Sequence, residues 1–311
     1  MRRAKRESDE RTDPGDGRPS IARAWACIAL LATAIGCGTN RYELPPGTTE
    51  PEASADEDKG WTKEQKFIAV NGGMALVIAA YGFQFWDYGG AHFQTIDEGW
   101  FGQETSYGGA DKLGHAYAAY LTTLGLASLY EDWGYERSKA DLYAAFSSMA
   151  AYTLIEVGDG FSKNGYSWED IVVDAAGVAF GYWRRREPAV GRLVDFRVEY
   201  IPSETFINGD HSDIVTDYSG FKYLLAFKLD GIEKLSKTPL GWLELQAGYY
   251  TRGFSTGDDA YFDEKERKYY FAVGLNVSRL LSKLGMRGLG KVFQFYQAPY
   301  TYVPFDWTIP P

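Results

Sequence analysis

The sequence predicts an α+β protein: a membrane-associated bundle of about four helices, rich in small residues, followed by a C-terminal antiparallel β domain. Residues 61–188 hold long apolar segments with small side chains at helical spacing, and after Pro188 the period becomes alternating. The 311 residues, 45% of them hydrophobic, supply enough apolar surface for two domains. We therefore expect four regions, at 1–37, 38–60, 61–188 and 189–311.

Residues 1–37 have the features of a bacterial lipoprotein signal peptide. An uncharged apolar run begins at Ala24 and ends in Ala34-Ile35-Gly36-Cys37, which resembles the lipobox whose cysteine is lipidated. The alternative is a plain cleaved signal peptide with an incidental cysteine. Gly38, not Asp, follows, and by resemblance to sorted lipoproteins this favours the outer membrane, facing the periplasm. We expect a protein of the bacterial cell envelope that is anchored to membrane lipid through Cys37.

Residues 38–60 predict a disordered tether, because their Pro, Glu, Asp, Thr and Ser content cannot bury enough apolar surface to fold. Thr62 and Gln65 then predict a capping box for the first helix. Residues 67–86 carry no charge and match the length of about 20 residues that crosses a bilayer, although Asn, Gln and Gly weaken this segment as an insertion signal. The aromatic loop from His92 to Gly109 is expected to be ordered and to cover the helix ends.

Three further helices are predicted at residues 112–130, 139–157 and 168–183, all rich in Ala, Gly, Ser and Tyr. One face of the last helix combines acids and glycines at helical spacing: Asp170, Asp174, Gly177 and Gly181. Small residues let helices approach closely, as membrane helices do. The same pattern suits a soluble bundle, so both interpretations stay open.

Five strands are predicted in the C-terminal region, at residues 193–201, 221–229, 241–250, 268–278 and 292–303. Short amphipathic stretches at 232–235 and 279–284 follow the second and the fourth strand. The aromatic content of 16% indicates contact with a lipid–water boundary or tight packing against glycine. A formal charge of −10 argues against a nucleic-acid partner, because phosphate neutralisation needs clustered Lys and Arg.

Ionisable residues interrupt the apolar helices in three short motifs. The motifs are Gly109-Ala110-Asp111-Lys112-Leu113-Gly114-His115, Glu156-Val157-Gly158-Asp159-Gly160 and Ser167-Trp168-Glu169-Asp170, with Asp174 one turn later. Burying an unpaired charge costs several kcal/mol, so such groups normally persist in a satisfied network or in a working site.

These motifs resemble those of the uncharacterised YfiM-like family of predicted bacterial lipoproteins, over about residues 91–188. A fainter similarity links them to the VanZ-like membrane family, which runs Asp-Lys-x-x-His, then Glu, then Ser-x-x-Asp, then Asn-x-x-Gly. Asp174 stands where that family has its Asn. Neither resemblance implies an established reaction, so both point to a membrane or envelope protein of unknown function.

The first hypothesis for the motifs is a structural network. Lys112 would pair with Glu156 or Asp159, and Asp170 would cap the last helix near Ser167. Such a network would fix the packing of the helices. It agrees with a non-enzymatic structural or accessory role in the envelope, which is the function we expect first.

The second hypothesis is a membrane-associated hydrolase acting on lipid or cell-wall precursors. His115, Glu156 and Asp159 are its candidate catalytic residues, and Asp111, four residues before His115, would orient the imidazole. Asp170 and Asp174 would complete that site.

The third hypothesis is binding without turnover. A His with several carboxylates can bind a divalent metal, although no known metal signature is present and no cofactor is predicted. A transport or assembly accessory is a further alternative, in which the β domain binds an envelope protein partner.

Overall fold

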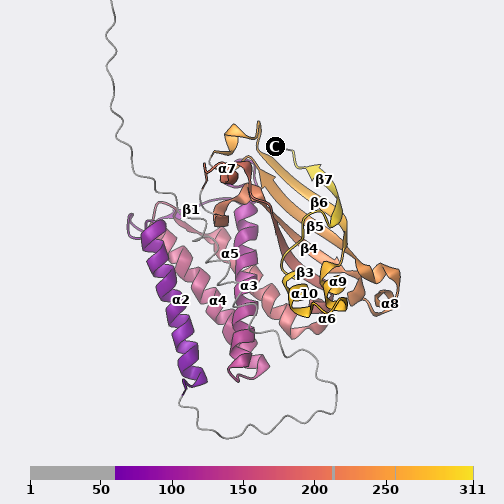
Figure 1. The fold of residues 1–311 in the computed structure, drawn as a ribbon. Coiled ribbons are helices and arrows are strands. Elements are labelled where there is room, and N and C mark those ends of the chain that lie inside the picture. The colour runs from indigo at the N-terminus through magenta and orange to yellow at the C-terminus, as the bar shows by residue number, and fades with distance from the viewer. Residues whose placement is uncertain (1–59, 212–213, 256, 311) are drawn as a thin grey trace, which may run out of the picture.

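The computed structural model describes residues 60–211, 214–255 and 257–310 (Figure 1). The expected signal peptide at 1–37, its lipidation site Cys37 and all but the last residue of the expected tether lie outside the described residues. Within them, long helices come first and a five-stranded antiparallel sheet follows. The expected α+β class, with its antiparallel C-terminal sheet, is therefore confirmed.

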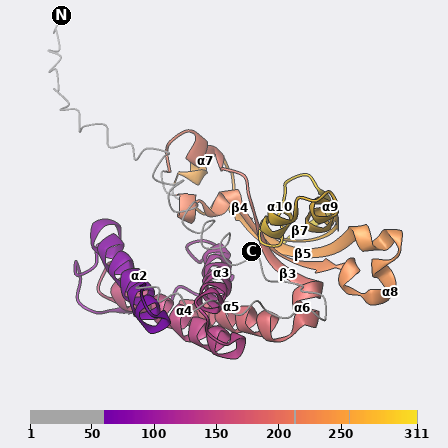
Figure 2. The same ribbon diagram turned by 60° about the horizontal axis from the view of Figure 1, so that its bottom comes forward.

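Four long helices match the four expected ones: α2 (Lys63–Phe85), α3 (Ala110–Asp132), α4 (Arg137–Gly160) and α5 (Trp168–Arg186). The predicted capping box forms, since Thr62 accepts the Gln65 N–H and the Gln65 side chain accepts the Thr62 N–H. Helix α3 packs against α4 and α5, and α2 packs against α4 (Figure 2). By length and composition, α2 is the one described helix that could cross a membrane, and 6% of its most apolar window is buried.

Glycines on α5 set how closely this helix approaches α3. A Cβ added at Gly177 would lie 2.1 Å from the Ala116 carbonyl oxygen, and one at Gly181 would lie 3.2 Å from the Tyr120 oxygen. No side chain fits at the first position without a shift of the backbone. The same face of α5 carries Asp170 and Asp174, so the close approach brings them against α3.

The sheet is an antiparallel meander in the order β3-β4-β5-β6-β7. Its strands are β3 (Val194–Tyr200), β4 (Phe221–Lys228), β5 (Leu243–Arg252), β6 (Glu266–Leu275) and β7 (Tyr302–Thr308). The first four agree with the predicted strands within a few residues. The two amphipathic stretches form the short helices α8 (Glu233–Ser236) and α9 (Val277–Lys283).

The predicted fifth strand at 292–303 is wrong in position. Helix α10 (Arg287–Val292) ends where that strand was expected to begin, and β7 starts only at Tyr302. The intervening residues make an isolated bridge to β3, in which the Gln297 N–H donates to the Val198 oxygen at 2.9 Å. The apolar residues of the predicted strand end α10 and form the bridge to β3, and the strand pairing begins only with β7.

The two faces of the sheet are unlike each other. One buries charge: Arg197 donates to Glu244 at 2.7 and 3.0 Å and to Asp195 at 2.8 Å, with Gln297 beside them. The opposite face is apolar, and much of it is exposed, including Leu225, Phe227, Leu245, Phe271, Phe305 and Trp307. Where α3 covers this apolar face, the main core forms from Tyr120, Leu124, Phe196, Tyr218 and Tyr223.

Candidate functional site

The ionisable residues of the three motifs converge where α3, α4 and α5 meet. Asp111 and Lys112 lie in the first turn of α3, and His115 lies one turn later. Helix α5 contributes Asp170 and Asp174 from its first two turns, and Glu156 lies near the end of α4. The side chains form two groups, a lysine cluster around Lys112 and a histidine cluster around His115.

The lysine cluster consists of Lys112, Glu98, Asp111 and Asp170. The Lys112 ammonium lies 3.0 Å from Asp111 Oδ2 and 2.9 Å from Asp170 Oδ1, and it forms an ion pair with Glu98. Only 1% of the Lys112 side chain is exposed. Burial alone would lower the pKa of Lys112, but the three carboxylates raise it, so the ammonium stays charged.

Two expectations about these residues are wrong. Lys112 pairs with the lysine-cluster carboxylates and not with Glu156 or Asp159. Asp111 approaches Lys112, and among the described residues no hydrogen bond or ion pair joins it to His115. Both differences follow from the rotation of α3, which points Lys112 toward the loop before α3 and toward the start of α5.

Glu98 is a site residue that the motif analysis missed. It lies in the loop from His92 to Gly109, which the sequence predicted to be an ordered cover for the helix ends. The strand β1 (Thr95–Ile96) holds this loop in place by parallel pairing with β2 (Tyr166–Ser167), directly before α5. Burial raises the pKa of Glu98 to about 7, although Lys112 acts to lower it. The sequence signal that could have identified Glu98 was an acidic residue in the loop predicted to cover the helix ends.

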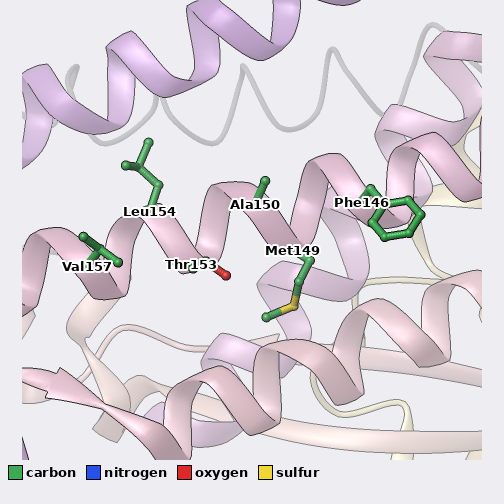
Figure 3. Close-up of a pocket in the computed structure, with 6 residues that line it drawn as sticks. All are labelled: Phe146, Met149, Ala150, Thr153, Leu154 and Val157. Atoms are coloured by element: carbon green, nitrogen blue, oxygen red, sulfur yellow. The ribbon is translucent and has the colours of Figure 1, made fainter.

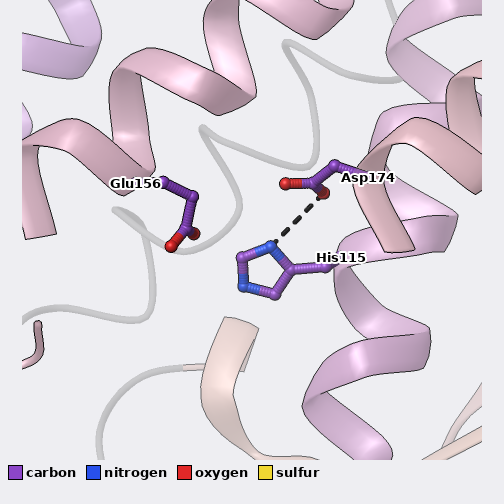
Figure 4. A group of neighbouring side chains, drawn as sticks. All are labelled: His115, Glu156 and Asp174. Atoms are coloured by element: carbon purple, nitrogen blue, oxygen red, sulfur yellow. Dashed lines mark ion pairs between the residues drawn. The ribbon is translucent and has the colours of Figure 1, made fainter. Parts of the chain in front are cut away.

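The histidine cluster consists of His115, Glu156 and Asp174 (Figure 4). His115 Nδ1 lies 3.4 Å from Asp174 Oδ1, and its Nε2 lies 4.0 Å from Asp170 Oδ1. The His115 side chain is 26% exposed, whereas Asp174 is fully buried and Glu156 nearly so. The imidazole is therefore the part of this cluster that solvent can reach.

The shifted pKa values of the histidine cluster reflect burial and crowding of carboxylates. Burial would lower the pKa of His115, but Asp174 and Asp170 outweigh it and raise the value to about 9. Burial raises the pKa of Glu156 to about 8, against the opposing effect of His115. Burial also raises the pKa of Asp174, whereas His115 and Lys112 outweigh burial at Asp170 and lower its pKa. The fold thus favours a proton on Glu156 and on His115 near neutral pH.

Ser167 positions two members of the site. Its hydroxyl accepts the Asp170 N–H at 3.2 Å and caps α5, and its own N–H donates to Glu156 Oε2 at 3.2 Å. The expectation that Asp170 caps this helix is wrong, since Ser167 is the capping residue and Asp170 lies three residues inside. Because Ser167 caps the helix, the Asp170 carboxylate can face Lys112 and His115.

Asp159 stands apart from the other predicted site residues. Its Oδ1 accepts a hydrogen bond from the Asn164 side chain at 3.0 Å, and its backbone oxygen accepts the Ser162 and Gly165 N–H groups. It belongs to neither cluster of potential metal ligands. Its contacts close the turn between α4 and α5.

The two clusters differ in how well their charges are compensated. The three carboxylates of the lysine cluster surround an ammonium ion, which already occupies the place of a cation. In the histidine cluster, His115 Nδ1 and both Asp174 oxygens are buried without a hydrogen-bond partner among the described residues. One ligand atom from each of its three residues lies within 4.8 Å of the others. Asp170 Oδ1 of the lysine cluster also lacks a hydrogen bond there, but it lies 2.9 Å from the Lys112 ammonium, whereas the one cationic group that pairs with Asp174 among the described residues is His115.

Two apolar hollows of the surface lie away from both clusters. A shallow apolar groove of about 460 Å³ runs along the outer side of α4, where Phe146, Met149 and Leu154 line it with three neighbours (Figure 3). A second one, of about 370 Å³, lies between Leu113 of α3 and the apolar face of the sheet. Neither is lined by a residue of the histidine or the lysine cluster, so the candidate site is indicated by its side-chain chemistry.

Comparisons with known proteins found a similarity for one part of this chain. No curated protein and no solved structure matches it. Residues 97–186 match a family described as "Predicted periplasmic lipoprotein (DUF2279)", whose function is unknown. The description supports a lipoprotein of the cell envelope but names neither the YfiM-like nor the VanZ-like family, so these two resemblances stay predictions. In the segment that contains both clusters, this chain is thus similar to predicted periplasmic lipoproteins.

Proposed function

We propose that this envelope lipoprotein holds a divalent cation between His115, Glu156 and Asp174. The observation that carries the proposal is Asp174, whose two carboxylate oxygens are buried and accept no hydrogen bond among the described residues. An ionised carboxylate in such a place needs a positive partner. His115 Nδ1 lies 3.4 Å from one of these oxygens, and a cation that displaces the imidazole proton would be that partner, with neutral His115 as a further ligand.

The donor atoms suit a transition-metal ion better than calcium or magnesium. One imidazole nitrogen and two carboxylate oxygens are ligands for Zn²⁺ or Mn²⁺, whereas Ca²⁺ and Mg²⁺ prefer oxygen alone. Bond lengths of about 2.1 Å require ligand atoms about 3.4 Å apart in tetrahedral geometry. The present separations are within 4.8 Å, so a small contraction of the side chains would complete the site.

A membrane location for this site is supported by the predicted anchor and by α2. The proposed lipid at Cys37 attaches the chain to the outer membrane, on its periplasmic side. The outward side of α2 exposes Ile68, Leu76 and Phe83, each by about two thirds or more, which suits contact with hydrocarbon. We assign the site to residues 61–188 and a supporting role to residues 189–311, whose sheet packs on α3.

In this account the cation has a structural or accessory role and no reaction is required. It would join α3, α4 and α5, because each helix supplies one ligand. An envelope protein partner could bind the assembled unit. Loss of the cation would loosen the end of the helices that also holds the lysine cluster.

A hydrolase is the second candidate, favoured by the acid–base properties of two residues. The pKa values of His115 and Glu156, about 9 and about 8, lie near physiological pH, where general acids and bases work best. His115 also reaches solvent. Loss of lipid turnover in His115→Ala, with folding unchanged, would favour this candidate over a purely structural cation.

The test of the proposed function is the metal content of the detergent-purified full-length chain, measured by inductively coupled plasma mass spectrometry after dialysis against Zn²⁺ or Mn²⁺. We expect about one cation per chain, lost in His115→Ala. His211→Ala is the matched control, because His211 bonds to Thr216 and lies outside both clusters. No bound cation in the unsubstituted chain would overturn the proposal.

A further inference from the structure

The segment that contains α9 and α10 has a charge unlike that of the rest of the chain. Residues 277–293 carry four cationic side chains, Arg279, Lys283, Arg287 and Lys291, and no Asp or Glu, in a chain with a net charge of −10. A run of this kind produces a local positive potential at one end of an otherwise acidic protein.

Large apolar side chains stand among these cations and are exposed. Leu284 is 64% exposed, Leu289 48% and Val292 46%, and Met286 between them is 44% exposed. The turn between the helices has open space at Gly285, since a Cβ added there would meet nothing within 4 Å. Exposed apolar groups interleaved with cations are typical of elements that lie in a membrane interface.

One cation, Arg279, holds this segment to the connection between β4 and β5. The Arg279 guanidinium donates to the Ser236 oxygen at 2.7 Å, lies 3.4 Å from Asp230 and stacks over Trp242. Among the described residues, Lys283 and Arg287 make no hydrogen bond or ion pair. Figure 1 shows α8, α9 and α10 together near one end of the sheet.

We propose that α9 and α10 form a contact surface for the headgroups of anionic lipids. Lys283 and Arg287 would meet the phosphates, and Leu284 and Leu289 would enter the interface beside them. Charge complementarity selects anionic over zwitterionic lipid, and the apolar side chains select a bilayer over an acidic protein surface or a nucleic acid. This proposal does not depend on the cation site, which lies among α3, α4 and α5.

The test measures the affinity of phosphatidylglycerol for the detergent-solubilised full-length chain by native mass spectrometry, with phosphatidylcholine as the reference lipid. Each Lys or Arg near an anionic surface is worth about 1 kcal/mol, so Lys283→Gln with Arg287→Gln should weaken phosphatidylglycerol binding roughly 30-fold. The matched control is Lys163→Gln with Lys265→Gln, which removes the same charge where a turn follows α4 and where β6 begins. We expect little change in the control.

Hydrogen exchange gives a second, local readout in nanodiscs. Amides of residues 282–293 should exchange more slowly in discs containing phosphatidylglycerol than in discs of phosphatidylcholine alone, and Leu284→Gln with Leu289→Gln should remove this protection. Equal affinity for the two lipids, or an equal loss in the control variant, would overturn the proposal. Equal exchange rates in the two kinds of nanodisc would also overturn the proposal.

Discussion

Asp174→Asn provides a direct test, because it separates a ligand from a member of a structural network. The Asp174 carboxylate already lacks hydrogen-bond donors, and burial raises its pKa, so the free protein gains little from its charge. An amide of the same shape should leave the free energy of unfolding of the cation-free protein within about 1 kcal/mol of its starting value. The substitution should at the same time abolish stabilisation by a cation.

Asp141→Asn is the matched control, since Asp141 is equally buried but paired. It accepts a hydrogen bond from Arg185, which also lies 2.8 Å from Glu131. Removing one partner of a buried ion pair costs about 3–5 kcal/mol, and we expect the lower end because Glu131 remains. This variant should be less stable but should still respond to the cation.

The assay is urea unfolding of the detergent-solubilised chain, with a chelator or with Zn²⁺ or Mn²⁺ at 100 times the dissociation constant. A cation that binds only the folded state then adds about 2.7 kcal/mol. We expect this gain in the unsubstituted chain and in Asp141→Asn, and none in Asp174→Asn. A loss of several kcal/mol in cation-free Asp174→Asn, or an unchanged cation effect there, would show that Asp174 is not a cation ligand.

Three further predictions concern pH, packing and the lysine cluster. Because the folded-state pKa values of Glu156 and His115 are raised to about 8 and about 9, the cation-free protein should lose stability as pH rises from about 4.5 to 9. Urea unfolding across this range should show the fall in the free energy of unfolding. The fall should be less steep below pH 8 in Glu156→Gln and less steep above pH 6.5 in His115→Gln. A free energy of unfolding that does not change with pH would contradict the prediction. Gly177→Ala should cost about 1–3 kcal/mol in the same assay, because its methyl group would meet the Ala116 oxygen, and unchanged stability would mean that α5 lies farther from α3. Lys112→Met should cost about 3–5 kcal/mol by leaving three carboxylates without their cation, with Lys163→Met as a surface control that should cost little.

Much of the helical part could be predicted from local signals. The capping box at Thr62 and the glycines of α5 are properties of the sequence, and each has the expected structural effect. The convergence of Asp170 and Asp174 with His115 also follows from helical spacing, since glycines on the same face bring α5 against α3. The partner of each charge could not be predicted, because it depends on the rotation of α3 about its axis.

For the sheet, prediction from the sequence has a different limit. Alternation predicted which residues share a face, and the register confirms it, for instance in the pairing of Phe227 with Leu245. It could not predict which face is buried, because that depends on what packs there. In this chain the face carrying Arg197 and Glu244 is buried and much of the apolar face is open. The fifth strand was misplaced because apolar residues near Val292 serve a helix end instead of a strand.

The most direct test of the central claim is X-ray absorption at the metal edge of the full-length chain loaded with Zn²⁺ or Mn²⁺. The account predicts one imidazole nitrogen and carboxylate oxygens around the metal, with the nitrogen lost in His115→Ala and the oxygen number reduced in Asp174→Asn. A shell of oxygen alone that neither substitution changes would contradict a site formed by His115, Glu156 and Asp174.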